Sequence, residues 1–485
     1  MKFEKILECE NLVIGSGPGG SITAFHLAEA GRDVLLVEEG TNSDRQPTES
    51  YSLEEMNLKY RNGGLTPAFG KTKISYVEGK CLGGASEINA GLYHRPPTSI
   101  LKDWQSNYKV SDLEEDQLIH YYETIERDLT ISKVPDGVGP SSMKIKQGAD
   151  KLNWESKEIP RYWKYSKNND GSWKGTRQSM SRTFIPKAVN AGTRLLENTK
   201  IKHLHLKNGD GLMASGVSIL ENGVEIKRDI YFKNVFVCAG AIQTPALLRR
   251  SGIKHNIGNS LRMHPMVRMP TLFNDRVFEA DRGVPVHQVQ EFKPHMTLGC
   301  SVSSPAFLAL WMSEQTEKIH EKLMNWPNYA IYYAAIISDS KGTIRNLPVI
   351  NEPLVRFNLS RNDMNFMGEG LYRLGKLLFT VGAEELLSPV QGHPLIKKPK
   401  DLEIFKKGLP HGITNVTTIH LFSSCPMGEN LRFCATDSFG KIHGYNNIYI
   451  NDASMLPSPP GVNPQGTIMA LALRNVTNFM QRKFS

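Results

Sequence analysis

The stretch that decides the fold is Asn11-Leu12-Val13-Ile14-Gly15-Ser16-Gly17-Pro18-Gly19-Gly20. Its first four residues form a short apolar run, which predicts a buried β-strand. The pattern Gly-x-Gly-x-x-Gly follows at once, and residues 21–30 then carry apolar side chains at roughly helical spacing up to Gly31. A glycine-rich turn between a strand and a helix is typical of the first unit of a dinucleotide-binding domain.

Each glycine of this turn has a physical task in such a unit. Gly15 permits the tight turn, Gly17 lets the backbone approach a pyrophosphate, and Gly20 allows the helix to pack closely on the strand. The helix N-terminus then faces the phosphates. A second apolar strand over residues 33–37 ends at Glu38, whose carboxylate can accept hydrogen bonds from both ribose hydroxyls of an adenine dinucleotide. The alternative is a glycine-rich turn in an ordinary α/β protein.

Length and composition fit an enzyme with two domains. The chain has 485 residues, more than a single core usually holds, and 40% of them are hydrophobic. No apolar run approaches the roughly 18 residues that a membrane-spanning helix needs. The N-terminus has acidic residues and no apolar segment before a cleavage site, so we expect a cytoplasmic protein. The six cysteines are scattered, which predicts neither a disulfide framework nor a metal site.

The net charge of +9 raises the question of nucleic-acid binding. One stretch, residues 161–174, interleaves cations with aromatic rings, a pattern that can stack bases. The other charges are mixed in sign, and the chain shows no recognition helix or RNA-binding motif. We therefore expect no nucleic-acid partner and interpret the stretch as a surface loop or as an aromatic wall over a substrate pocket. The remaining charge is interpreted as a solvated surface, with attraction to anionic substrates or membrane surfaces as the alternative.

Further motifs lie far apart along the chain. The second glycine motif is Gly79-Lys80-Cys81-Leu82-Gly83-Gly84-Ala85-Ser86-Glu87-Ile88-Asn89. In the middle stand Val235-Phe236-Val237-Cys238-Ala239-Gly240-Ala241 and Gly258-Asn259-Ser260-Leu261-Arg262-Met263-His264-Pro265. Near the C-terminal end stand His420-Leu421-Phe422-Ser423-Ser424-Cys425-Pro426-Met427-Gly428, Asp452-Ala453-Ser454 and Val462-Asn463-Pro464-Gln465-Gly466. In order and spacing, the set resembles the glucose-methanol-choline oxidoreductase family.

This resemblance implies an α/β fold in which an FAD-binding, Rossmann-like domain carries a second, sheet-based α+β substrate domain. The cofactor domain of the family is discontinuous. We therefore expect residues 1–95, 196–268 and 411–485 to form it, and residues 96–195 and 269–410 to form the substrate-binding cap.

The resemblance also implies the residues that hold FAD. Members that bind the flavin covalently often carry a histidine where this chain has Ile88, so we expect noncovalent FAD. The helix that follows Asn463 is expected to aim its N–H groups at the flavin, with Gln465 as a candidate to touch the ring. The expected cofactor-binding residues are Gly15, Gly17, Gly20, Glu38, Gly83, Gly84, Ser86, Asn89, Asp452, Ala453, Pro464 and Gln465.

Alcohol oxidation requires a base beside the hydroxyl while the carbon faces the flavin. By resemblance His420 is this base, and Asn463 donates its amide to the substrate oxygen. The alternatives are a hydrogen-bonded core histidine at 420, in an apolar, strand-like setting, and an N-cap role for Asn463 ahead of Pro464 at the first helical position. Four further histidines, ranked below His420, compete for the base role: His94, His264, His411 and His443. Ala85 and Ser423-Ser424 depart from the residues that are usual in the family.

The predicted function is FAD-dependent oxidation of a small-molecule alcohol to an aldehyde or ketone, with O₂ or another acceptor reoxidising the flavin. Two alternatives stay open. One is a non-redox flavin enzyme of the same family, a lyase or a light-driven decarboxylase. The other is a nicotinamide-dependent dehydrogenase that uses the first motif alone, against which Gly83-Gly84 argues. No motif indicates the alcohol, the electron acceptor or the oligomeric state.

Overall fold

A seven-stranded sheet is built around β1, which leads into the first glycine turn. In the computed structural model, which describes residues 5–64, 66–278, 284–313, 318–348, 350–393 and 395–482, the strand order is β10-β11-β12-β1-β2-β9, with β23 paired to β12. The pairs that β1 makes with β12 and β2 are parallel, and their buried apolar residues suit a sheet covered on both faces. The strands are β1 Ile6–Ile14, β2 Val34–Val37, β9 Arg194–Leu196, β10 Thr199–Lys207, β11 Asp210–Ile219, β12 Glu225–Val237 and β23 Ile448–Ile450.

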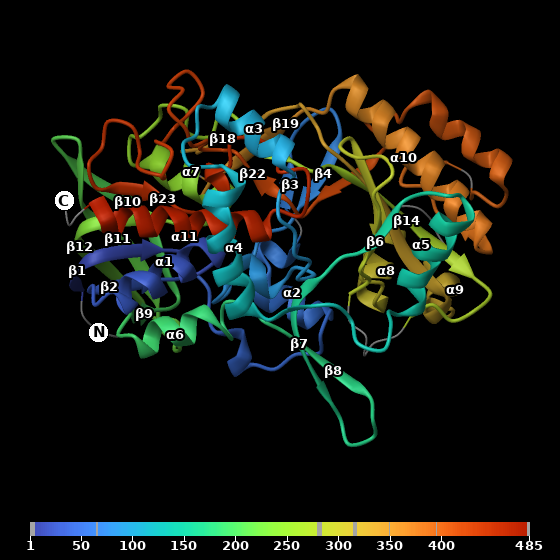
Figure 1. Cartoon of the computed structure of the whole chain (residues 1–485), viewed down its shortest axis with the longest axis horizontal. Coiled ribbons are helices and arrows are strands. Elements are labelled where there is room, and N and C mark those ends of the chain that lie inside the picture. The colour runs from blue at the N-terminus through green and yellow to red at the C-terminus, as the bar shows by residue number, and fades with distance from the viewer. Residues whose placement is uncertain are drawn as a thin grey trace.

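Helices from both halves of the sequence pack on this sheet. Figure 1 shows the last helix, α11, beside the first, α1, with α4 at the end of α11 and α6 below. The first strand, β1, and the last helix, α11, therefore belong to the same lobe. The helices of this lobe are α1 Pro18–Glu29, α3 Thr98–Asn107, α4 Glu115–Leu129, α6 Phe184–Asn190, α7 Gly240–Arg250 and α11 Gln465–Arg482.

A nine-stranded, mainly antiparallel sheet forms the second lobe. Its order is β3-β4-β21-β14-β17-β16-β15-β6, with β20 also paired to β14. α10 and α5 pack on each other and on this sheet (Figure 1). The strands are β3 Thr66–Ala68, β4 Lys73–Tyr76, β6 Ser156–Glu158, β14 Met266–Phe273, β15 His287–Val289, β16 Met296–Cys300, β17 Tyr329–Ile336, β20 Ala383–Leu386 and β21 Asn415–Thr418; the helices are α5 Pro140–Lys151, α8 Pro305–Met312, α9 Ile319–Leu323 and α10 Arg361–Thr380.

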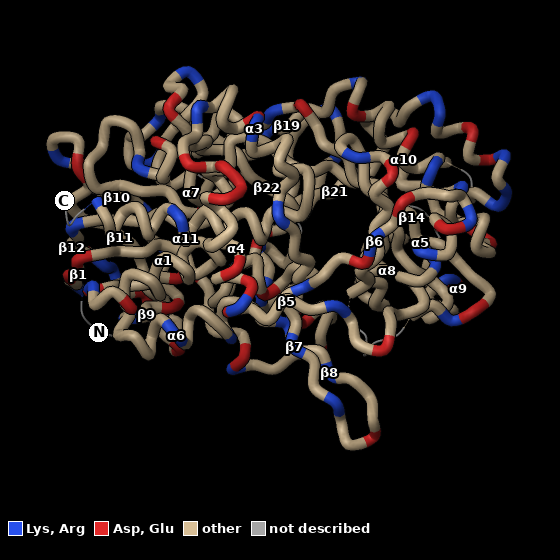
Figure 2. The backbone as a smooth tube through the Cα atoms, viewed as in Figure 1, with Lys and Arg blue, Asp and Glu red and all other residues tan. Residues whose placement is uncertain are grey.

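Smaller elements connect the lobes. The stretch of cations and aromatic rings forms a β-hairpin that projects from the molecule (Figure 1), and its base is buried at Arg161 and Tyr162. Figure 2 shows Lys and Arg interspersed with Asp and Glu over both lobes. The remaining elements are α2 Leu53–Lys59, β5 Ile131–Ser132, β7 Arg161–Lys167, β8 Trp173–Arg177, the pair β13 Arg262–Met263 and β22 Leu421–Phe422, and the pair β18 Gly342–Arg345 and β19 Leu354–Phe357.

The predicted fold class is confirmed, an α/β cofactor domain with a second sheet. The helix expected from residue 21 begins at Pro18, and the strand expected from residue 11 begins at Ile6. The two largest of four hydrophobic clusters among the described residues lie one around each large sheet, and α3 and α4 pack in the first of them. The domain bounds given above stay a prediction. Within the described ranges, no helix is both long and apolar enough to cross a membrane.

Candidate active site

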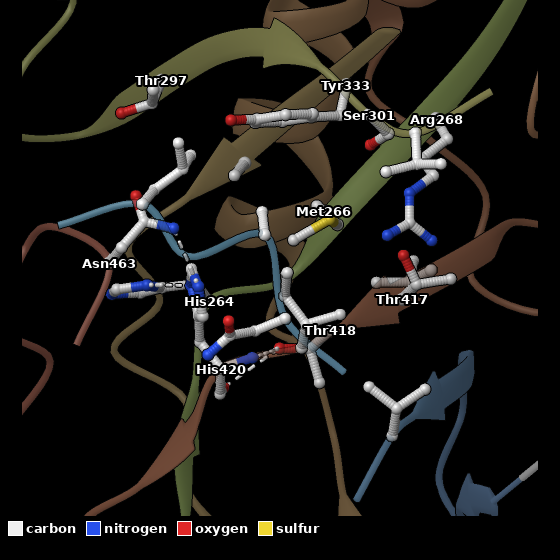
Figure 3. A pocket seen from close by; sticks show the side chains of 18 of the residues that line it. His264, Met266, Arg268, Thr297, Ser301, Tyr333, Thr417, Thr418, His420 and Asn463 are labelled. Atoms are coloured by element: carbon white, nitrogen blue, oxygen red, sulfur yellow. Dashed lines mark hydrogen bonds between the residues drawn. The ribbon is translucent and has the colours of Figure 1, made fainter. Parts of the chain in front are cut away.

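A cavity of about 290 Å³ lies between the nine-stranded sheet and the segments that carry His420 and Asn463. β14, β16, β17 and β21 form one wall, and the second glycine motif contributes Ala85, Ile88 and Asn89. Figure 3 shows His420, His264 and Asn463 gathered at one side of this cavity. We call it the substrate cavity.

His420 sits at a break between two strands. β21 ends at Thr418 and β22 begins at Leu421, so the continuous strand suggested by the sequence is interrupted at the histidine. The Thr418 hydroxyl donates to the His420 carbonyl (3.0 Å) and accepts from its N–H (3.2 Å). The break therefore has a fixed geometry that turns the imidazole into the cavity.

Hydrogen bonds define the protonation pattern of the imidazole. Gln288 donates its amide N–H to Asn463 Oδ1 (3.4 Å), so the Asn463 amide nitrogen faces His420 Nε2, at 3.1 Å. Because Nε2 accepts there, the proton of neutral His420 lies on Nδ1, which is 3.1 Å from His264 Nδ1. His420 thus presents an unprotonated Nε2 toward the cavity, as a base requires (Figure 3).

Burial keeps the histidines of this cluster neutral. It lowers the pKa of His420 to about 4 and that of His264 well below its usual value, the latter with a smaller contribution from charge on His420. His94 also lines the cavity, and burial, with the charge of Lys293 next in importance, lowers its pKa to about 3. A neutral imidazole at pH 7 is free to accept a proton.

The competing histidines divide into two groups. His264 and His94 lie in the substrate cavity, whereas His411 contacts Thr72 Oγ1 (2.7 Å) and His443 contacts the Gly428 carbonyl (3.1 Å). The contact of His264 with His420 arises because β13 pairs with β22, placing Met263 opposite Leu421. No sequence signal announces that pairing.

Three further wall residues lie in stretches without a recognisable motif. Gln288 on β15 holds Asn463, and Tyr333 on β17 accepts from the Gln288 amide (3.0 Å). Arg268 on β14 also faces the cavity (Figure 3). The one sequence signal for it is a lone arginine within the apolar run Met266–Met269.

Asn463 does not act as a cap in the expected register. α11 begins at Gln465, and its first intrahelical bond runs from the Ile468 N–H to the Pro464 carbonyl (2.9 Å). Pro464 therefore occupies the N-cap position. The side chain of Asn463 instead forms hydrogen bonds with His420 and Gln288. The helix still directs its N-terminal end, through Gln465 and Ile468, toward a second cavity.

This second cavity, of about 180 Å³, follows the first glycine motif and is called the cofactor cavity here. Val77, Ala85 and Ile419 line both cavities, so the two adjoin there. Predicted residues in its wall are Gly15, Gly17, Glu38, Gly84, Asp452, Ala453 and Gln465. Those placed outside its wall are Gly20, Gly83, Ser86, Asn89 and Pro464.

The carboxylate of Glu38 is largely occupied by the protein. It accepts from the N–H (2.9 Å) and hydroxyl (2.6 Å) of Ser16 and from the Gly40 N–H (2.8 Å). A carboxylate offers about four acceptor positions, so about one remains for a ribose, against the two hydroxyls expected from the sequence. Ser16 Oγ also accepts from the Gly83 N–H (2.9 Å), which joins the two glycine motifs.

The residues outside the wall support those within it. A Cβ on Gly20 would lie 1.9 Å from the Gly15 carbonyl oxygen, so Gly20 serves close helix packing, as predicted for this position. The Ser86 hydroxyl donates to the Gly83 carbonyl (2.7 Å). The Asn89 amide donates to Gln465 Oε1 (3.1 Å). Gln465 Nε2 therefore points away from Asn89.

Two observations test whether this cavity fits a dinucleotide. Gly17 has φ −61°, which any residue can adopt, and a Cβ on it would meet no protein atom within 4 Å. Neither conformation nor protein packing demands glycine there, whereas a pyrophosphate lying against the backbone does. Gln465 Nε2 is buried without a hydrogen-bond partner, which leaves a donor for a polar cofactor ring. The residues fit FAD.

A dinucleotide domain whose cofactor cavity adjoins a second cavity with a buried His-Asn pair defines a cofactor-dependent enzyme. Two family models, both described as GMC oxidoreductase, match residues 56–266 and 339–472. An uncharacterized GMC-type oxidoreductase of Sinorhizobium fredii is 37% identical over 479 residues, covering 98% of this chain and 95% of that protein. The chain belongs to the GMC oxidoreductase family, and its cofactor is FAD.

More distant relatives share the length of the chain. A long-chain-alcohol oxidase of Arabidopsis thaliana is 24% identical over 522 residues, covering 98% of this chain and 69% of that protein. The crystal structure of pyridoxine 4-oxidase from Mesorbium loti has a TM-score of 0.74 at 17% identity, covering 98% of this chain and 99% of that chain. This structural likeness shows the shared fold.

Proposed function

We propose that the protein oxidises an alcohol to an aldehyde or ketone, with His420 as the general base. The observation that carries the proposal is the unprotonated Nε2 of His420, 3.1 Å from the amide nitrogen of Asn463. An alcohol oxygen beside both groups, in place of their direct contact, would accept from Asn463 while its proton points at His420. The names of relatives such as the long-chain-alcohol oxidase support the reaction class.

The residues divide the work as follows. When bound, noncovalent FAD supplies the acceptor for the hydride of the C–OH carbon. His420 takes the hydroxyl proton on Nε2. Because the other proton of the ring is held on Nδ1 by the contact with His264, Nε2 stays unprotonated and available. Asn463, oriented by Gln288, holds the oxygen in place. A positioned base of this kind contributes about 10²–10⁴ to the rate.

The test is anaerobic titration of the purified, FAD-loaded protein with a panel of sugars, sterols and aliphatic and aryl alcohols, followed by visible absorbance. We expect one class to bleach the flavin band. The His420→Ala variant should retain the flavin and reduce it at least about 10²-fold more slowly. His411→Ala is the matched control, because His411 lies in neither cavity wall. Reduction by His420→Ala at the wild-type rate would refute the role of the base.

Product analysis separates this proposal from the non-redox alternative. A lyase or decarboxylase would form product while the flavin band stays unchanged. A colourless protein that turns over only with added NAD would instead support the nicotinamide alternative.

A further inference from the structure

Among the described residues, none provides a counter-charge for one arginine of the substrate cavity, Arg268. The Arg268 side chain makes no hydrogen bond and no ion pair with any described residue, and its Nε is buried without a partner. Its guanidinium carbon lies 4.3 Å from the centre of the Trp311 ring. Burial lowers the pKa of Arg268 to about 10, so it stays charged at pH 7. A buried charge is costly unless something pairs with it.

The strand register directs this charge into the cavity. On β14, Met266 and Arg268 line the cavity, whereas the alternate residues Val267 and Met269 are fully buried in the second core. Arg268 lies directly opposite Tyr333 on β17. The alternation of side chains along β14 therefore places Arg268 in the cavity wall.

Unpaired polar groups lie near the guanidinium. Thr417 on β21 is paired in register with Met266, which makes it the diagonal neighbour of Arg268, and its hydroxyl is buried without a partner. Figure 3 shows Arg268, Thr417 and Ser301 at one side of the cavity and His420 with Asn463 at the other. These three donors can surround one small anion.

The charges of the cavity wall are all of one sign. Its Lys and Arg residues are Lys73, Arg268 and Lys293, and no Asp or Glu belongs to the part of the wall that the structure describes. The lining between the two polar ends is largely apolar, with Met266, Met296 and Ile336 among its members. An apolar chain that ends in an anion matches this arrangement.

We propose, on the basis of the function proposed above, that the substrate is a hydroxy acid whose carboxylate binds Arg268 while its hydroxyl lies beside His420 and Asn463. A carboxylate matches the planar fork of a single guanidinium, with Thr417 and Ser301 as further donors. His264, which contacts His420, and Arg268 are four residues apart, so their Cα atoms can be at most about 14 Å apart. The hydroxyl and carboxylate of the substrate are therefore separated by on the order of 10 Å.

The experiment compares acids with their neutral isosteres. ω-Hydroxyalkanoates from hexanoate to dodecanoate and the corresponding ω-hydroxyalkanamides are tested as reductants of the FAD-loaded protein. In parallel, octanoate and octanamide, which carry no hydroxyl, are titrated against the flavin spectrum to measure binding alone. We expect the acids to exceed the amides in kcat/KM, and octanoate to exceed octanamide in affinity, by at least about thirtyfold.

Two variants test the role of Arg268. Arg268→Met keeps a long apolar stem against Trp311 and should abolish the preference for acids, while Arg268→Lys should retain part of it. Arg373→Met is the matched control, because Arg373 also stacks on an aromatic ring, that of Phe292 at 3.9 Å, but does not line the cavity. Arg373→Met should change the ratio of kcat/KM for acids to that for amides by less than about twofold. The flavin spectrum and thermal midpoint of each variant establish that it is folded.

The outcomes separate the two proposals. Equal use of acids and amides by the wild type, or an unchanged preference in Arg268→Met, would overturn the assignment of Arg268. Tighter binding of octanoate that depends on Arg268, with no flavin reduction by any alcohol, would support the anion site and overturn alcohol oxidation. Flavin reduction by neutral alcohols and not by hydroxy acids would support alcohol oxidation and overturn the anion site at Arg268.

Discussion

Replacing His264 by leucine tests how the base is held in its reactive form. The His264 side chain is 6% exposed, and its Nδ1 accepts the proton of His420 Nδ1 across 3.1 Å. When His420 becomes an imidazolium, this bond becomes charge-assisted, worth about 1.5–3 kcal/mol against about 0.5–1.5 kcal/mol for the neutral pair. The difference, about 1–1.5 kcal/mol, corresponds to about five- to tenfold in rate.

Loss of tautomer control adds to this effect. Without an acceptor at Nδ1, part of the His420 population carries its proton on Nε2 and cannot act as a base. We therefore expect kcat/KM of His264→Leu to fall by roughly tenfold to fiftyfold, with FAD still bound. The assay is stopped-flow reduction of the flavin under anaerobic conditions, with whichever alcohol proves to be a substrate.

Two further variants make the result specific. His264→Asn offers a side-chain oxygen as acceptor and should recover part of the rate. His411→Leu removes a histidine whose hydrogen bond, to Thr72, lies outside both cavities, and should change the rate less than about twofold. If the leucine and asparagine variants at 264 lost equal activity, or if His264→Leu matched His411→Leu, the reasoning about the tautomer would be wrong.

Three other predictions follow from single observations. Because burial lowers the pKa of His420 to about 4, kcat/KM for a neutral alcohol should stay level from neutral pH down to about 5 and fall as the pH passes through 4, and a profile with its midpoint near 6.5 would contradict this. Gly17→Leu should fold but weaken FAD binding, measured as flavin released on gel filtration, whereas Gly20→Leu should not yield folded protein, because its Cβ would lie 1.9 Å from the Gly15 carbonyl oxygen. Ser423 has φ +62° and a buried hydroxyl without a partner, so Ser423→Gly should raise the free energy of unfolding by about 1 kcal/mol, and a lower thermal midpoint would count against the strain.

The lowered pKa of His420 should also make the free energy of unfolding depend on pH. The unfolded chain binds protons at histidine near pH 6.5, whereas folded His420 stays neutral until about pH 4. The free energy of unfolding should therefore be unaffected by this group above pH 6.5 and decrease as the pH falls from 6.5 to 4. Chemical denaturation at pH 7 and pH 5 measures the difference, which should shrink in His420→Leu.

The sequence predicts those parts of the molecule that depend on local order. The turn Gly15–Gly20 with Glu38 predicts a strand, a helix and a second strand, because Gly15 and Gly20 leave no room for a Cβ and Gly17 leaves its backbone open to a pyrophosphate. His420 and Asn463 could be found in the same way, since both lie in motifs. What remained hidden depends on pairing between distant segments. His264 contacts His420 through the β13–β22 pair, and Gln288 reaches Asn463 from a strand without any motif.

The residues that no motif indicated belong to a different part of the molecule from the motif residues. His420 and Asn463 line the substrate cavity within two residues of Ile419, Leu421 and Gln465, which line the cofactor cavity, whereas Gln288 and Arg268 belong to the nine-stranded sheet. The Gln288–Asn463 hydrogen bond joins the two groups across the substrate cavity. In the proposed function, motif residues of the first group therefore carry out the chemistry, and sheet positions such as 268 select the alcohol, because the side chain there faces the cavity while the backbone pairing does not depend on which side chain it is. A change at 268 should alter which alcohol is oxidised and leave the position of His420 unchanged.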